Sequence, residues 1–172
     1  GGQVFLPPSY LKTVYQWVRA QGGLCIADEV QTGFMRLGEG RFWGFERAGV
    51  VPDVVILGKS MGNGHPIAGV VCTEDIAEAF DNGMEFFSSY GGNPVSCAAG
   101  LAVLEVLESQ GLSINQTGTH LRQGLESLAE EFPEFLGEVR GEGLFFGLEW
   151  VREGSNPHPE LATYLKEYLY QQ

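Results

Sequence analysis

Basic side chains are scarce in this sequence. Lysine and arginine together number 10 against 22 aspartates and glutamates, so the formal net charge is -12 at pH 7. A protein that binds nucleic acid or an anionic membrane surface needs a basic face that meets the phosphates. The charge balance therefore argues against nucleic acid and against a membrane as partners. It leaves room for a small anionic ligand, which a few backbone amides and one or two cations can hold.

Cysteine is also scarce, and its three copies at Cys25, Cys72 and Cys97 form no CxxC pair. An odd number of cysteines without a pairing motif argues against a disulfide framework and favours a reducing compartment. No apolar run is long enough to cross a bilayer, and no secretory signal peptide is found. We expect a cytoplasmic protein, or a mitochondrial one if a missing N-terminus carries a transit peptide, since the sequence begins at Gly1 without methionine.

What the sequence does contain is an alternation of amphipathic helices with short apolar runs. Ser9 predicts the N-cap of a first helix that stops at Gly22, and Asn93-Pro94 predicts the start of a longer helix that stops at Gly111. The apolar runs between them are typical of buried strands, at residues 24–27, 53–57 and 68–72. This alternation predicts an α/β fold with a largely parallel sheet.

The composition changes after Gly111. A polar helix is predicted over residues 112–132, the segment VRGEGLFFGLEW predicts a strand or hairpin, and a last helix begins near Pro159. We therefore predict two domains, residues 1–111 and 112–172. No metal site is predicted, because His120 and His158 have no ligand partners at useful spacing.

Two residues with chemical potential follow the predicted strands. Asp28 comes at the end of the first strand and Lys59 directly after the second, and open α/β sheets bind ligands at these strand ends. A lysine after the apolar run VVILG would be partly desolvated, which would make its neutral amine available as a nucleophile. An acid at such a position can hold a buried cation. The alternatives are a lysine in a surface loop and an acid that caps a turn.

The residues Gly58-Lys59-Ser60 also resemble the end of a phosphate-binding P-loop. That motif needs a glycine five residues before Gly58, where this sequence has Asp53. The spacing therefore excludes an NTPase.

Four segments occur in a specific order: ADEVQTGFMRLG, PDVVILGKSMGNGHPIAG, SSYGGNPVSCAAG and VRGEGLFFGLEW. Together they resemble the class-III aminotransferases, pyridoxal-phosphate (PLP) enzymes of fold type I, over essentially the whole chain. FWGFE and GKSMGNGHP are most similar to the branch that holds alanine–glyoxylate aminotransferase 2 and the ethanolamine-phosphate and phosphohydroxylysine phospho-lyases. The resemblance implies that residues 1–111 belong to a PLP-binding large domain and residues 112–172 to the start of an α+β C-terminal small domain.

The resemblance also implies roles for four residues around the cofactor ring. Lys59 matches the lysine that forms a Schiff base with PLP, and Asp28 matches the acid on the ring nitrogen. Val30 matches the side chain packed on one ring face. Gln31 matches the residue near the phenolic oxygen of the ring.

Two further residues are matched outside the ring. Ser89 stands where the family usually has threonine, whose hydroxyl binds the cofactor phosphate from a neighbouring subunit, so the resemblance implies a homodimer with a shared active site. Arg140 matches an arginine that clamps a substrate carboxylate. Met35 departs from the family, which usually has glycine there, and we expect the loop before Arg36 to be shaped differently.

The function implied is that of a transaminase. Such an enzyme moves an amino group from an amine or amino acid to a 2-keto acid, with Lys59 and Asp28 as the catalytic residues. One alternative is a PLP-dependent phospho-lyase on the same fold. Another is a fragment without activity of its own, because family members are much longer than this chain.

Overall fold

The computed structural model describes residues 3–38, 40–152 and 156–172, and it describes the side chains of all these residues except 110–112. The chain forms two compact units. One is Leu6–Ile114, and the other joins Gly1–Phe5 to Asn115–Gln172. Each unit is described by itself below. Their assignment to a large and a small domain stays a prediction.

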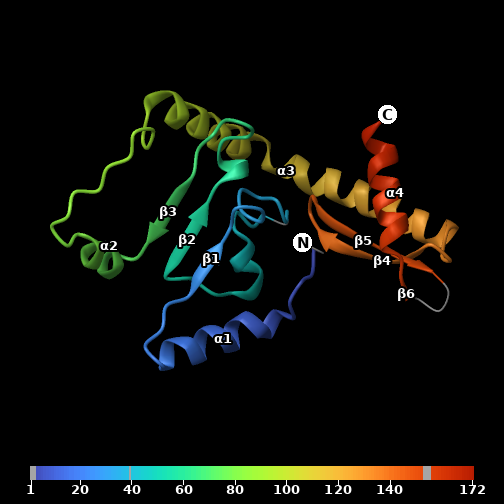
Figure 1. The fold of residues 1–172 in the computed structure, drawn as a ribbon, viewed down its shortest axis with the longest axis horizontal. Coiled ribbons are helices and arrows are strands. Elements are labelled where there is room, and N and C mark those ends of the chain that lie inside the picture. Colours follow the sequence, from blue (N-terminus) through green and yellow to red (C-terminus); the bar gives the residue numbers. More distant parts are fainter. Residues whose placement is uncertain (1–2, 39, 153–155) are drawn as a thin grey trace. The chain divides into compact units, whose positions relative to one another are not determined.

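The first unit is built on a three-stranded sheet in the order β1-β2-β3 (Figure 1). Strands β1 and β2 are parallel, with Asp28 opposite Ile56. Strands β2 and β3 are antiparallel, with Leu57 opposite Gly69. The three strands are short, and their bounds are Ile26–Asp28, Val54–Leu57 and Gly69–Cys72.

The third strand differs from the largely parallel sheet that the sequence predicts. Two parallel strands need a long crossover, usually with a helix, whereas residues 58–68 contain only the short 3-10 helix η2 (Lys59–Met61). The chain therefore turns back, and β3 runs antiparallel. The prediction of buried strands is also wrong in part, because Ile26, Val70 and Val71 are 58%, 65% and 57% exposed.

The helices of the first unit lie close to the predicted positions, with bounds Pro8–Ala20 (α1), Gly44–Ala48 (the 3-10 helix η1), Glu74–Phe80 (α2) and Pro94–Glu131 (α3, which continues into the second unit). The cap of α1 is Pro7, not Ser9 as predicted. Pro8 takes the first helical position, where its missing N–H costs nothing. The predicted cap of α3 is confirmed, because Oδ1 of Asn93 accepts a hydrogen bond of 2.9 Å from the N–H of Ser96.

The predicted stop at Gly111 falls where α3 breaks into two stretches, Pro94–Ser109 and Ser113–Glu131. In the described part of the chain, no single helix is long and apolar enough to cross a membrane. Two stretches of α3, taken together, reach the required length and apolar composition, and nothing else supports a membrane span.

The second unit contains the predicted hairpin, which is confirmed. Strands β4 and β5 are antiparallel, and Val139 lies opposite Leu148. The turn between them uses Gly143, whose φ of +58° lies in the left-handed region that suits glycine. The bounds of the remaining elements are Leu136–Glu142 (β4), Phe145–Arg152 (β5), Asn156–Pro157 (β6) and Pro159–Tyr170 (α4).

Asp53 ties the elements of the first unit together at the start of the sheet. Its Oδ2 accepts a hydrogen bond of 2.7 Å from the N–H of Cys25, just before β1. Its Oδ1 lies 2.8 Å from Nη2 of Arg19, near the end of α1. The Arg19 hydrogen bond, followed by that of the Cys25 amide, lowers the pKa of Asp53.

We predict that Asp53→Asn destabilises the protein by about 1–2 kcal/mol at neutral pH, because a charged acceptor of two hydrogen bonds is lost. The folded state lowers the pKa of Asp53, so its contribution is present above the unfolded pKa of about 4 and is lost as the pH falls below it. Urea unfolding at several pH values measures this. The two proteins should converge in acid, and a gap that persists unchanged well below pH 4 would contradict the assignment.

Candidate active site

The ends of β1 and β2 bring the two predicted catalytic residues to one edge of the sheet. The strands are parallel, so their C-terminal ends lie side by side. Asp28 is the last residue of β1, and Lys59 follows the last residue of β2, Leu57, after a single glycine. An acid and an amine therefore occupy neighbouring strand ends, which is where open α/β sheets bind ligands.

Lys59 has an unusual backbone conformation. Its φ is +38°, in the left-handed region, which costs a residue with a side chain roughly 1–2 kcal/mol. Such strain is typical of functional sites, where the surrounding structure holds a residue in place. The Lys59 side chain forms no hydrogen bond or ion pair with the described residues. It is exposed, so the predicted desolvation is absent in this chain; the strand that leads to it is also partly open, with Ile56 36% exposed.

Asp28 is exposed and is bonded on one side only. Its Oδ1 accepts a hydrogen bond of 3.1 Å from the N–H of Val30, two residues on. This is a local turn that fixes the direction of the carboxylate. The other oxygen has no hydrogen-bond partner among the described residues. It is therefore available to a cation at the strand ends.

Val30 and Gln31 lie in the turn that follows. A Cβ at Gly58 would lie 3.6 Å from both methyl carbons of Val30, so Val30 packs on the backbone directly before Lys59. Gln31 is exposed. Met35, further along, has a φ of +62°, a conformation that the family's usual glycine takes without strain.

Glu29 is a residue whose importance the sequence did not reveal. It is only 3% exposed. Its Oε2 accepts hydrogen bonds of 2.8 Å from the Thr32 hydroxyl and 2.8 Å from the N–H of Gly44, and its Oε1 accepts one of 2.9 Å from the N–H of Phe45. In the sequence it is one of two adjacent acids after a strand, a pattern that a solvated turn would also give.

Ser89 lies in an exposed segment between α2 and α3. It is exposed itself, and so are the aromatic residues around it, with Phe86, Phe87 and Tyr90 at 75%, 79% and 85%. Exposed apolar clusters of this kind mark interaction surfaces.

Ser96 is a second residue that the sequence did not reveal. It is 6% exposed and lies in the first turn of α3. Its hydroxyl is within hydrogen-bond distance of His65 Nε2 and of Asn93 Nδ2, at 2.9 Å each. It also donates to the carbonyl of Pro66 at 3.3 Å. The loop that follows Lys59 is thus anchored to the start of α3, and His65 serves this anchor.

Arg140 belongs to the second unit and is paired with two carboxylates. It lies on β4 opposite Gly147. Its Nη1 is 2.8 Å from Oε2 of Glu138, and its Nη2 donates to Glu149 on β5. The hydrogen bond to Glu149, and then that to Glu138, raise the pKa of Arg140. A substrate carboxylate at Arg140 would have to compete with these glutamates.

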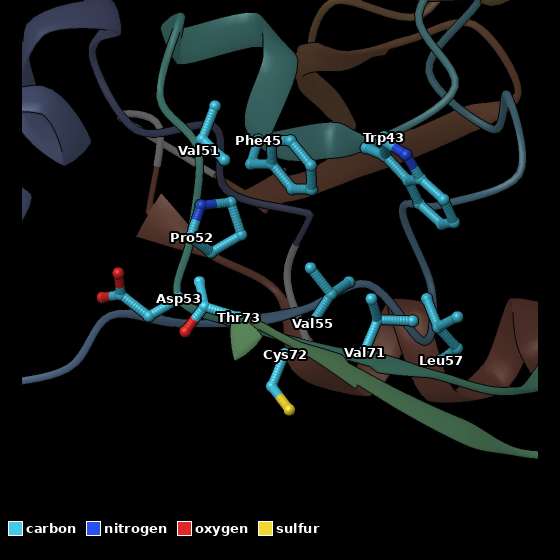
Figure 2. A pocket seen from close by; sticks show the side chains of 10 residues that line it. All are labelled: Trp43, Phe45, Val51, Pro52, Asp53, Val55, Leu57, Val71, Cys72 and Thr73. Atoms are coloured by element: carbon cyan, nitrogen blue, oxygen red, sulfur yellow. The ribbon is translucent and has the colours of Figure 1, made fainter. Parts of the chain in front are cut away.

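A pocket of about 290 Å³ lies on one face of the first sheet. Figure 2 shows Val55, Leu57 and Val71 on the strands and Trp43 and Phe45 facing them across it. Its lining is mostly apolar, with Asp53 and Thr73 as polar members. None of the predicted site residues lines it, so it is not the place where Asp28 and Lys59 would act.

Comparison with known proteins identifies relatives along nearly the whole chain. The family described as "Aminotransferase class-III" matches residues 1–169. The alanine–glyoxylate aminotransferase 2-like protein of Drosophila melanogaster is 47% identical over 163 residues, which are 93% of this chain and 33% of that protein. Human mitochondrial alanine–glyoxylate aminotransferase 2 is 45% identical over 160 residues, 92% of this chain and 31% of that protein. The chain thus spans about a third of the length of these relatives.

Solved structures agree with this result. A phospholyase from Arthrobacter, in complex with phosphoethanolamine, has 44% identity and a TM-score of 0.85 and covers 93% of this chain and 38% of its own. An S-selective transaminase from Arthrobacter sp. with alanine bound has 32% identity and a TM-score of 0.79, covering 92% and 34%. The predicted fold is confirmed over the matched residues.

We predict that Ser96→Ala destabilises the protein by about 1–3 kcal/mol, because it leaves the His65 and Asn93 side chains without their buried partner. Ser109→Ala is the matched control, since the Ser109 hydroxyl makes an exposed bond to Val106 on the same helix and its loss should cost less than about 0.5 kcal/mol. Thermal unfolding compares the two variants. Equal losses would show that the His65 anchor contributes nothing.

Proposed function

The chain belongs to the class-III aminotransferase family, and on that premise we propose that it carries the lysine and the ring-nitrogen acid of a PLP-dependent transaminase. The proposed reaction moves an amino group from an amine or amino acid to a 2-keto acid. The observation that carries the proposal is that Asp28 and Lys59 lie at the C-terminal ends of two neighbouring parallel strands. Both side chains have functional atoms that no described residue occupies.

The residues at this edge fit PLP by their chemistry. An aldehyde carbon needs an amine, and Lys59 is the lysine at the strand ends. A protonated ring nitrogen needs an anion, and Asp28 offers its unbonded oxygen. A flat ring needs an apolar side chain against one face, and Val30 lies next to the Lys59 backbone. Gln31, exposed in the same turn, is the proposed partner of the phenolic oxygen.

Bound PLP would supply a ring that accepts electrons from the reacting carbon. The residues of this chain would do the rest. Asp28 would hold the proton on the ring nitrogen by charge pairing. Lys59, once an incoming amine has displaced it, would act through Nζ as the base that takes a proton from the substrate carbon and delivers it to the former aldehyde carbon of the cofactor. The left-handed backbone at Lys59 would set the direction in which its side chain leaves the strand end.

We further propose that Ser89 binds the cofactor phosphate of a second copy, so that the enzyme is a homodimer with a shared active site. The support is the exposed aromatic segment in which Ser89 lies, with Phe86 75% and Tyr90 85% exposed. A second subunit would cover this surface and remove its apolar area from water.

A phospho-lyase is the second candidate function. The support is the Arthrobacter phospholyase, which at 44% identity is as similar to this chain as the human aminotransferase at 45%. In that reaction phosphate would leave from the carbon next to the one that bears the amine. The two functions differ at Arg140, because ethanolamine phosphate has no carboxylate for it to hold.

The length of the chain limits what it does by itself. It spans about a third of the length of its relatives, so a fragment without independent activity is the third candidate.

The human and Arabidopsis relatives are named as mitochondrial. We propose a reducing compartment, either cytoplasm or mitochondrion, for the protein that carries this chain.

The proposal predicts where the cofactor attaches. In the full-length protein loaded with PLP, borohydride converts the bond between the lysine amine and the aldehyde into a stable amine. Peptide mapping should then find the label on Lys59, and Lys59→Ala should abolish both labelling and turnover while Lys12→Ala leaves them unchanged. A label on Lys12 or Lys166 would sink the assignment.

The carboxylate clamp predicts a substrate-dependent effect of Arg140→Ala. For a transaminase the variant should weaken an amino acid or keto acid by on the order of 2–5 kcal/mol, as when one partner of a buried charge pair is removed. An amine without a carboxylate should be unaffected. Steady-state kinetics with both substrates measures this, with Arg152→Ala, an exposed arginine at the end of β5, as the control in the same unit. Equal losses on both substrates would leave Arg140 as a partner of Glu138 and Glu149 only.

A further inference from the structure

Glu29 is the most completely bonded acidic side chain at the candidate site, and nothing in the proposed reaction uses it. We propose that Glu29 is a positioning residue, whose buried carboxylate fixes the turn that aims Asp28 at the cofactor and seats Val30 beside Lys59. The inference rests on the proposed function. Glu29 touches neither substrate nor cofactor and acts through its neighbours.

The backbone of Glu29 joins the two strand ends. Its N–H donates to the carbonyl of Ile56 on β2 at 3.0 Å, and its own carbonyl accepts from the N–H of Gly33 at 3.0 Å. The first bond holds the chain beside the strand that leads to Lys59. The second closes the turn that contains Val30 and Gln31. The position of this residue therefore fixes where the turn begins and how tightly it closes.

The side chain of Glu29 joins this turn to a distant part of the chain. Its oxygens accept from the Thr32 hydroxyl and from the N–H groups of Gly44 and Phe45, at 2.8, 2.8 and 2.9 Å. A carboxylate that is 3% exposed needs such donors in place of water. Charge-assisted hydrogen bonds of this kind are stronger than neutral ones. The long loop between β1 and η1 is thereby closed on one side chain.

Two glycines make room for this closure. A Cβ at Gly44 would lie 2.8 Å from Oγ1 of Thr32 and 3.2 Å from Oε2 of Glu29. A Cβ at Gly33 would lie 2.9 Å from the Glu29 carbonyl oxygen and 3.1 Å from the Trp43 ring. At both positions a Cβ would be too close to its neighbours, so the loop and the carboxylate fit together only with glycine.

The consequence for the site passes through Val30. The N–H of Val30 donates to Oδ1 of Asp28, which leaves the other oxygen without a hydrogen-bond partner among the described residues. The Val30 methyl groups pack on Gly58, next to Lys59. If the carboxylate of Glu29 loses a donor, the turn loosens, and both the direction of Asp28 and the contact with Gly58 change together.

The test uses the full-length protein loaded with PLP that is 15N-labelled at the ring nitrogen. In Glu29→Gln the new amide group faces a backbone N–H and cannot accept from it, so one of the three bonds is lost. We expect the 15N signal to move from the protonated toward the neutral ring nitrogen, and the Kd for PLP to rise on the order of tenfold, as for outer-shell partners of ligating residues. Asp53→Asn is the matched control, because Asp53 also accepts a backbone N–H but at the opposite ends of the strands.

A second variant separates a positioning effect from a failure of Glu29→Gln to fold. Gly44→Ala leaves the carboxylate intact and pushes it away from Thr32, and it should shift the 15N signal in the same direction. An unchanged signal in both Glu29→Gln and Gly44→Ala, or an equal shift in Asp53→Asn, would overturn the positioning role. If the unmodified protein shows no protonated ring nitrogen, the proposed function itself fails, which is a separate result.

Discussion

The candidate site depends on one buried carboxylate. Burying a charge in a protein is costly unless hydrogen bonds replace the water it loses, and Glu29 is compensated by a hydroxyl and two backbone N–H groups. Because those donors come from both ends of the loop between β1 and η1, satisfying this charge also fixes the loop. The turn beside Asp28, the contact of Val30 with Gly58 and the close approach of Gly44 all follow from it.

A second constraint is the arrangement of the strand ends. Parallel pairing of β1 with β2 places an acid and a lysine at one edge, and the antiparallel return of β3 leaves the loop after Lys59 free to turn toward the start of α3. There the Ser96 hydroxyl forms hydrogen bonds with His65 and Pro66 of this loop. The left-handed backbone of Lys59 lies between these two anchors, so the structure holds the strained residue from both sides.

Residue patterns predicted the parts of this structure that local physics determines. The hairpin of β4 and β5, the Asn93 cap of α3 and the positions of Asp28 and Lys59 at strand ends depend on periodicity and capping within a few residues. The direction of β3 was missed, because it depends on how much chain connects two elements. Glu29 and Ser96 were missed for a related reason, since most of their partners are 15 or more residues away in sequence.

In the proposed function, Asp28 and Lys59 hold one cofactor ring between them. A structure of the full-length protein with PLP, at a resolution that shows side chains, tests it most directly. We expect continuous density from Nζ of Lys59 to the cofactor and an oxygen of Asp28 within hydrogen-bond distance of the ring nitrogen, about 2.6–3.2 Å. Density that joins the cofactor to another lysine, or an Asp28 carboxylate turned away from the ring, would contradict it.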